Sequence, residues 1–103
     1  MGLFSKLFGS KGPNKTEEYL ANGAVVIDVR NADEFAGGHV EGSKNIPVGA
    51  IGHKVNQIKK LKKPVILCCA SGMRSGKATD ILKREGIDAI NGGSWKAVNR
   101  YFS

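Results

Sequence analysis

Hydrophobic and polar residues along the chain follow two alternating patterns. Short apolar runs rich in β-branched residues, which are typical of buried strands, occupy 24–29, 40–46, 65–68 and 87–90. Segments with apolar residues three or four positions apart, the spacing of a helix that covers a core, occupy 14–22, 31–36, 50–60, 75–85 and 95–101. Because the two kinds alternate, the sequence predicts an α/β fold with helices flanking a mostly parallel central sheet of 4–5 strands.

Capping residues mark the beginnings of the first two predicted helices. Asn14 or Thr16 can cap the first helix, and Asn31 or Asp33 can cap the second, because their side-chain oxygens can accept the free N–H groups of a first turn. The regular alternation of elements begins at this first cap. We therefore expect one domain over residues 14–103.

A cysteine stands at the junction between the third apolar run and the fourth helical segment. Cys69 directly follows the run 65–68, and the predicted helix 75–85 begins shortly after it. The first N–H groups of a helix have no partner within it and carry partial positive charge. A tight loop at such a junction can direct several N–H groups at one anion, which would stabilise a thiolate as a nucleophile. We therefore predict that Cys69 is the catalytic residue.

The loop after Cys69 has the composition of an anion-binding loop. Gly72 suits a turn with an unusual φ angle, and Arg74 adds a fixed charge with forked donors for sulfate-like or phosphate-like oxygens. Ser75 is expected to cap the helix that follows. The predicted substrate-binding loop consists of Ala70, Ser71, Gly72, Met73 and Arg74.

Other short motifs lie on both sides of this loop. They are Asp28-Val29-Arg30, Asp33-Glu34-Phe35, Gly38-His39-Val40, Gly42, Asn45-Ile46-Pro47, and Gly92-Gly93 before Trp95. Together with the Cys-x-x-Gly-x-Arg spacing of the loop, these motifs resemble the rhodanese-like domain of single-domain sulfurtransferases. The resemblance covers about residues 16–100, with the motifs in the order and spacing of that family.

The resemblance implies a rhodanese-like three-layer sandwich and a two-step sulfur transfer. Cys69 would take sulfane sulfur from a small anionic donor such as thiosulfate, or from a persulfide donor, and would then carry it as a persulfide. Cyanide, a thiol or a protein sulfur acceptor would remove it. No metal and no organic cofactor is implied. The family also assigns a bracing polar network, rather than catalysis, to Asp28, Arg30, Glu34 and His39.

Two alternatives to this enzyme stay open. The first is a phosphatase or arsenate reductase, because Cys68 and Arg74 have the Cys-x5-Arg spacing of tyrosine phosphatases; those enzymes, however, have glycine where this register places Ser71. From Cys69, the loop is one residue shorter than in phosphatases of the rhodanese fold, which favours sulfur. The second alternative is a relay module that passes its persulfide only to a protein partner, without turnover of small molecules.

Cys68 is expected to face the core, because neighbouring side chains of a strand point to opposite faces. A second interpretation makes Cys68 a thiol that protects Cys69 against over-oxidation. Adjacent cysteines cannot staple distant segments, and with two histidines they offer no metal-ligand spacing. A reactive thiol suits a reducing compartment, and no segment has a signal-peptide or membrane-span pattern. We expect a cytoplasmic protein that is a monomer.

The formal net charge is +7, and part of it comes from a lysine-rich segment at 54–63. Since no aromatic residue is interleaved with these lysines, we interpret the segment as a solvated helix face and expect no nucleic-acid binding. Residues 1–13 form an amphipathic tail with apolar residues at Leu3, Phe4 and Leu7. One or two turns are too few to hold firmly alone, so we expect a frayed tail, or a turn on the domain's own surface, rather than a segment that docks on a membrane or a partner.

Overall fold

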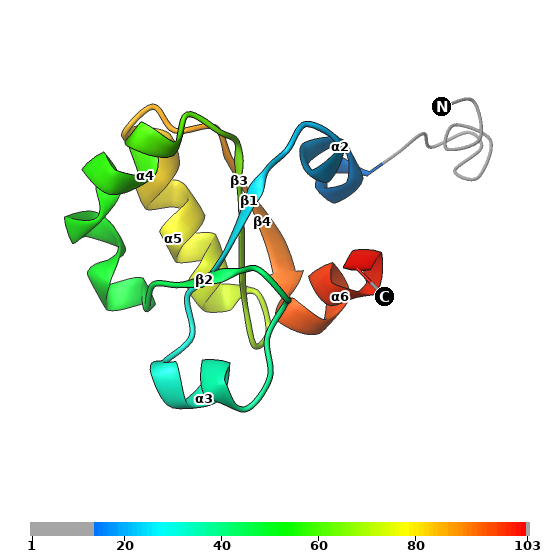
Figure 1. Cartoon of the computed structure of the whole chain (residues 1–103). Coiled ribbons are helices and arrows are strands. Elements are labelled where there is room, and N and C mark those ends of the chain that lie inside the picture. Colours follow the sequence, from blue (N-terminus) through cyan, green and yellow to red (C-terminus); the bar gives the residue numbers. More distant parts are fainter. Residues whose placement is uncertain (1–13, 103) are drawn as a thin grey trace, which may run out of the picture.

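The computed structural model describes residues 14–102, whose four strands form one sheet with helices on both faces (Figure 1). All strand pairings are parallel, in the order β2-β1-β3-β4. The strands are β1 (Val25–Asp28), β2 (Lys44–Asn45), β3 (Val65–Cys69) and β4 (Ala89–Ser94). The α-helices are α2 (Lys15–Ala21), α3 (Ala32–Ala36), α4 (Val55–Leu61), α5 (Met73–Arg84) and α6 (Trp95–Asn99). The predicted α/β class is confirmed, while the tail predicted for residues 1–13 lies outside the described part.

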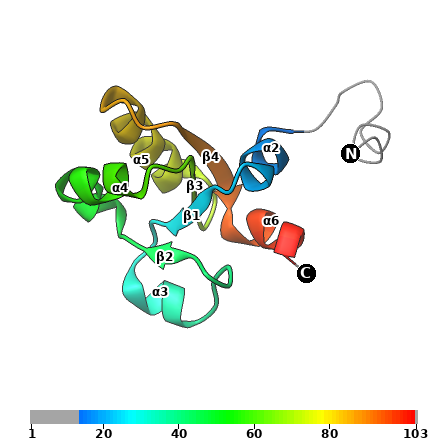
Figure 2. The same ribbon diagram turned by 45° about the horizontal axis from the view of Figure 1, so that its top comes forward.

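The helices form two layers on opposite faces of the sheet. Figure 2 shows α4 and α5 on one side and α2 and α6 on the other, with α3 beyond the edge strand β2. The side of α4 and α5 buries Ile27, Val65, Leu67, Cys69, Ile58, Ala78 and Leu82. The side of α2 and α6 buries Val26, Ile66, Cys68, Val40 and Val98. Within residues 14–102, no helix is long and apolar enough to cross a membrane.

Strand β3 lies between β1 and β4, and all of its residues are buried. Its side chains alternate between the faces, so that Cys69 points toward α5 and Cys68 points toward α6. The core-facing position predicted for Cys68 is therefore confirmed. Since parallel strands end at one edge of a sheet, Cys69 at the end of β3 lies at the same edge as the segments that follow β1 and β4.

Two predicted helix beginnings are confirmed by their caps. The Asn14 side chain accepts the N–H of Glu17 at 2.9 Å, and the Glu17 carboxylate accepts the N–H of Asn14 at 3.2 Å. This reciprocal pair satisfies two backbone donors that would otherwise have no partner. Asn31 precedes α3, and its N–H donates to Glu34 at 3.0 Å.

The helix predicted over residues 50–60 is confirmed only from Val55 onward, as α4. The structure has a 3-10 helix (Val48–His53), which Lys54 separates from α4. Gly49 and Gly52 both lie in the 3-10 segment, and glycine is a poor former of α-helix. The last predicted helix is also divided, because α6 is followed by a 3-10 turn (Arg100–Phe102).

The strands also differ from their predicted lengths. The segment 40–46 pairs with β1 only through the two residues of β2. Strand β4 begins two residues later than the predicted strand 87–90 and continues through a glycine pair to Ser94. A Cβ atom on Gly92 would lie 2.8 Å from the Ile66 side chain and 2.7 Å from Val98. Glycine at this position therefore lets β4 and α6 pack closely on β3.

Candidate active site

The sulfur of Cys69 lies against the first turn of α5. The backbone N–H of Gly72 donates to Sγ at 3.0 Å, and the backbone N–H of Ser75 donates at 3.4 Å. The hydroxyl oxygen of Ser75 is also 3.4 Å from Sγ. Groups that can donate a hydrogen bond thus converge on one sulfur atom, an arrangement that can hold negative charge.

These contacts lower the pKa of the Cys69 thiol below its ordinary value. Burial alone would raise this pKa, because it removes water from the thiolate, but the hydrogen bonds from Ser75, Gly72 and the Ser71 backbone outweigh it. At Cys68, burial and then the charge of Asp28 raise the pKa to about 12. Of the two adjacent thiols, Cys69 is therefore the one whose thiolate is favoured.

Gly72 turns the chain from β3 directly into α5. Its φ of 103° is in the left-handed region, and a Cβ atom there would lie 3.3 Å from the Cα of Gly93. Because this turn ends at Gly72, α5 begins at Met73, before the predicted start. The prediction that Ser75 caps the helix is therefore wrong. Ser75 lies inside the first turn, where its side chain contacts Cys69 instead.

Arg74 forms an ion pair with α3. Its two terminal nitrogens lie 2.8 Å and 3.2 Å from the carboxylate oxygens of Glu34. This pair connects the beginning of α5 to the loop after β1. The charge of Arg74 still interacts with Cys69. Direct contact of Arg74 with a substrate stays a prediction.

The polar residues after β1 form the network that the sequence analysis assigned to bracing. The Arg30 guanidinium lies 2.7 Å from the buried Asp28 carboxylate and donates to the carbonyl of Gly38 at 2.6 Å. Arg30 also lies over the ring of Trp95, 4.9 Å from its centroid. The ring of His39 stacks on Phe35 and donates from Nδ1 to the Phe35 carbonyl at 2.7 Å. None of these contacts, among the described residues, reaches the Cys69 sulfur.

The side chains of the predicted binding loop point mostly to solvent. Ala70 and Ser71 are exposed, and Met73 is 81% exposed, whereas Cys69 is fully buried. The loop thus offers its backbone to the sulfur and its side chains to the surroundings.

Asn91 in β4 belongs to the site, although the sequence analysis did not single it out. Its Oδ1 atom accepts from the Ser75 hydroxyl at 2.6 Å, and its Nδ2 atom donates to the Gly72 carbonyl at 2.9 Å. Its position directly before the Gly92-Gly93 motif could have drawn attention to it, because that motif brings β4 under the loop.

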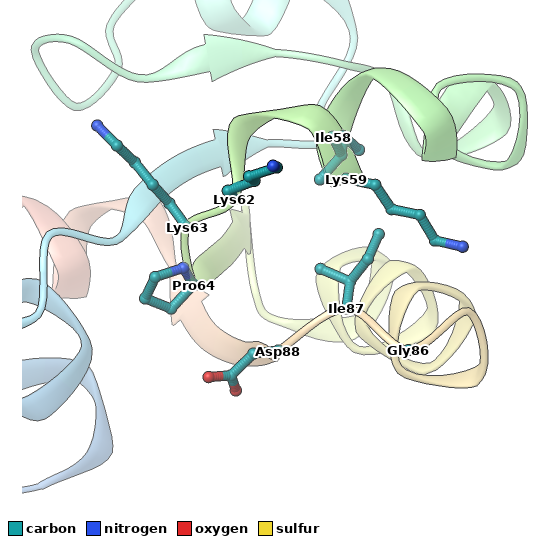
Figure 3. Close-up of a pocket in the computed structure, with 8 residues that line it drawn as sticks. All are labelled: Ile58, Lys59, Lys62, Lys63, Pro64, Gly86, Ile87 and Asp88. Carbon is teal, nitrogen blue, oxygen red and sulfur yellow. The ribbon is translucent and has the colours of Figure 1, made fainter.

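A surface hollow with basic residues lies at the other end of the sheet. Figure 3 shows Lys59, Lys62 and Lys63 around Ile58 and Ile87, next to the amino ends of β3 and β4. These three lysines of the lysine-rich segment therefore lie away from Cys69. Figure 3 shows no thiol among the labelled side chains, and we assign no chemistry to this hollow.

Known proteins resemble this chain over most of its length. The sequence matches the family described as "Rhodanese-like domain" over residues 13–100. The uncharacterized protein YqhL of Bacillus subtilis (strain 168) is 41% identical over 78 residues, which cover 73% of this chain and only 61% of YqhL. The thiosulfate sulfurtransferase GlpE of Ectopseudomonas mendocina (strain ymp) is 32% identical over 91 residues, which cover 84% of this chain and 83% of GlpE.

Solved structures show the same fold. A rhodanese-like domain protein from Staphylococcus aureus has a TM-score of 0.68 at 30% identity, over 81% of this chain and 86% of that one. The human single-domain sulfurtransferase TSTD1 has a TM-score of 0.64 at 28% identity, over 79% and 86% of the two chains. With the match over residues 13–100, these similarities show that the chain belongs to the rhodanese-like domain family.

Proposed function

We propose that the protein is a sulfurtransferase that carries sulfane sulfur as a persulfide on Cys69. Its donor is thiosulfate or a persulfide, and its acceptor is cyanide or a thiol. The observation that supports this proposal is the convergence of hydrogen-bond donors from Gly72 and Ser75 on the Cys69 sulfur. The relative GlpE, which is named a thiosulfate sulfurtransferase, agrees with this chemistry.

The proposed reaction has two half-reactions. In the first, the Cys69 thiolate attacks the outer sulfur of thiosulfate, and a bond forms between Sγ and that sulfur. Sulfite leaves with the electron pair of the broken sulfur–sulfur bond. In the second, the acceptor attacks the outer sulfur of the persulfide and the Cys69 thiolate is released, so that cyanide becomes thiocyanate and a thiol becomes a persulfide. The enzyme is covalently modified between the two steps, so we expect ping-pong kinetics.

The roles of the surrounding groups follow from their positions. The N–H groups of Gly72 and Ser75 stabilise negative charge on the attacking sulfur, and the N-terminal end of α5 adds the partial positive charge of a helix N-terminus. Arg74 brings a full positive charge near Cys69, which favours an anionic donor. Since the chain needs a reduced Cys69 for this cycle, we propose a reducing compartment such as the cytoplasm.

Steady-state turnover of thiosulfate and cyanide to thiocyanate tests the proposal. Wild type should show parallel double-reciprocal lines, and Cys69→Ser should have no activity. Cys68→Ser is the matched control, because it changes the neighbouring thiol and should keep turnover. Full activity in Cys69→Ser, or hydrolysis of an aryl phosphate without any thiocyanate formation, would contradict the proposal.

A relay to a protein acceptor is the second candidate, and the exposure of Met73 favours it. An apolar side chain that is 81% exposed beside a buried sulfur is the kind of group that a protein partner covers. In that case a Cys69 persulfide, once formed, should persist in excess cyanide and small thiols. Rapid loss of the persulfide to cyanide in a single-turnover experiment would favour the enzyme over the relay.

A further inference from the structure

The side-chain amide of Asn91 has an orientation that backbone groups determine. Its Nδ2 atom lies 2.9 Å from the carbonyl oxygen of Gly72, and its Oδ1 atom lies 2.9 Å from the backbone nitrogen of Gly93. A carbonyl can only accept a hydrogen bond, and a backbone N–H can only donate one. Gly72 and Gly93 therefore establish which end of the amide is nitrogen and which is oxygen.

This orientation determines where Ser75 keeps its hydroxyl proton. The Oδ1 atom of Asn91 carries no hydrogen, so at 2.6 Å the Ser75 hydroxyl is the donor. The same hydroxyl oxygen lies 3.4 Å from the Sγ atom of Cys69. Because a hydroxyl has one proton, Ser75 can donate to the sulfur only when its O–H bond turns away from Asn91.

We propose that Asn91 is a positioning residue that competes with the Cys69 sulfur for the Ser75 proton. While the sulfur is uncharged, Ser75 donates to Asn91. When the sulfur is a thiolate, the O–H bond rotates toward it, because hydrogen bonds to charged acceptors are the stronger ones. This rotation forms and breaks no covalent bond. Asn91 thereby keeps the fraction of Cys69 that is thiolate below the fraction expected without its amide.

The position of Ser75 itself does not depend on Asn91. Ser75 is fully buried in α5, where its N–H donates to Cys69 and its carbonyl accepts from the Thr79 hydroxyl at 2.6 Å. Loss of the Asn91 amide should therefore free the Ser75 hydroxyl to donate to the sulfur without moving the serine.

The other partners of Asn91 also keep the site intact. The Gly72 carbonyl retains a second donor, the backbone N–H of Gly76 at 3.0 Å. When the Ser75 O–H bond rotates away from Asn91, the Gly93 N–H still donates a hydrogen bond to the Asn91 oxygen. Rotation of the Ser75 O–H bond between Asn91 and Cys69 thus leaves no buried polar group without a partner.

The test is the titration of the Cys69 thiolate in Asn91→Leu, since leucine has a similar branched shape without the polar atoms. The ultraviolet absorbance of the thiolate is recorded against pH, and the signal of the same variant with Cys69→Ser is subtracted. Loss of a competing neutral hydrogen bond should lower the midpoint by about half to one pH unit. The shift should disappear when Asn91→Leu is introduced into the Ser75→Ala protein. A midpoint that rises or stays unchanged would overturn the proposal.

Two further variants make the result specific. Asn45→Leu is the matched control. The Asn45 amide, in β2, also donates to backbone carbonyls, those of Asp28 at 3.0 Å and Arg30 at 2.9 Å, and its loss should leave the midpoint unchanged. If Asn91→Leu does not fold, Asn91→Ala should shift the midpoint in the same direction, by less because water can replace the amide.

The proposal rests on the proposed function only in taking Cys69 as the reacting group, and the titration needs no sulfur donor. A missing shift with intact thiocyanate formation would overturn the competition alone. A clear shift without any sulfur transfer would overturn the proposed function alone.

Discussion

Replacement of Gly72 by alanine should damage both the fold and the site. The φ of 103° at Gly72 is one that residues with a Cβ rarely adopt, and such strain costs about 1–3 kcal/mol. The new Cβ would also lie 3.3 Å from the Cα of Gly93. That neighbour is backbone within the bulged part of β4, so it cannot rotate away as a flexible side chain would.

The expected result for Gly72→Ala is a loss of about 2–3 kcal/mol in the free energy of unfolding, toward the upper end of the strain range because of the added contact. We also expect a higher pKa at Cys69, since relief of the strain moves the Gly72 N–H from its position 3.0 Å from the sulfur. Urea unfolding measures the first effect, and titration of the thiolate absorbance measures the second.

Gly86→Ala is the matched control for this prediction. Gly86 also has a left-handed φ, of 82°, but a Cβ atom there would have no neighbour within 4 Å. Its replacement should cost about 1–2 kcal/mol from backbone strain alone and leave the Cys69 titration unchanged. If Gly72→Ala is no less stable than Gly86→Ala and titrates like wild type, the reasoning on the close approach of loop and β4 is refuted.

Three more predictions concern neighbouring parts of the structure. Ser75→Ala should raise the pKa of Cys69, because the thiolate loses a hydroxyl donor; an unchanged thiolate titration would contradict this role. Gly92→Ala should cost roughly 1–3 kcal/mol in urea unfolding from overpacking, whereas Gly49→Ala, with open space around it, should be near neutral; equal effects would refute the packing argument. The ion pair with Arg74 lowers the pKa of Glu34 from 4.5 to about 2, so its stabilisation is complete above pH 4.5 and is lost as pH falls toward 2. Urea unfolding should show this small pH dependence in wild type and not in Glu34→Gln, and identical profiles would contradict it.

The sequence was informative where local rules determine the structure. Alternation along β3 assigned Cys68 and Cys69 to opposite faces, because neighbouring strand residues point to opposite faces. Asn14 and Asn31 marked the beginnings of α2 and α3, because capping depends on side chains within three residues.

Other features depend on contacts between distant segments and could not be predicted. A glycine pair normally indicates a break, but Gly92 lies inside β4 because Ile66 and Val98 leave no room for a side chain there. Arg74 meets Glu34 only after the loops of β1 and β3 have come together. The link from Asn91 to Ser75 likewise joins two segments that meet only in the folded chain.

The central claim is that Cys69, and not Cys68, is the activated thiol that carries sulfur. Intact mass after incubation with thiosulfate tests it most directly, in wild type, Cys69→Ser and Cys68→Ser. The account predicts a gain of one sulfur atom in wild type and Cys68→Ser and no gain in Cys69→Ser. A gain that disappears only in Cys68→Ser would contradict it, as would no gain in any of the three proteins.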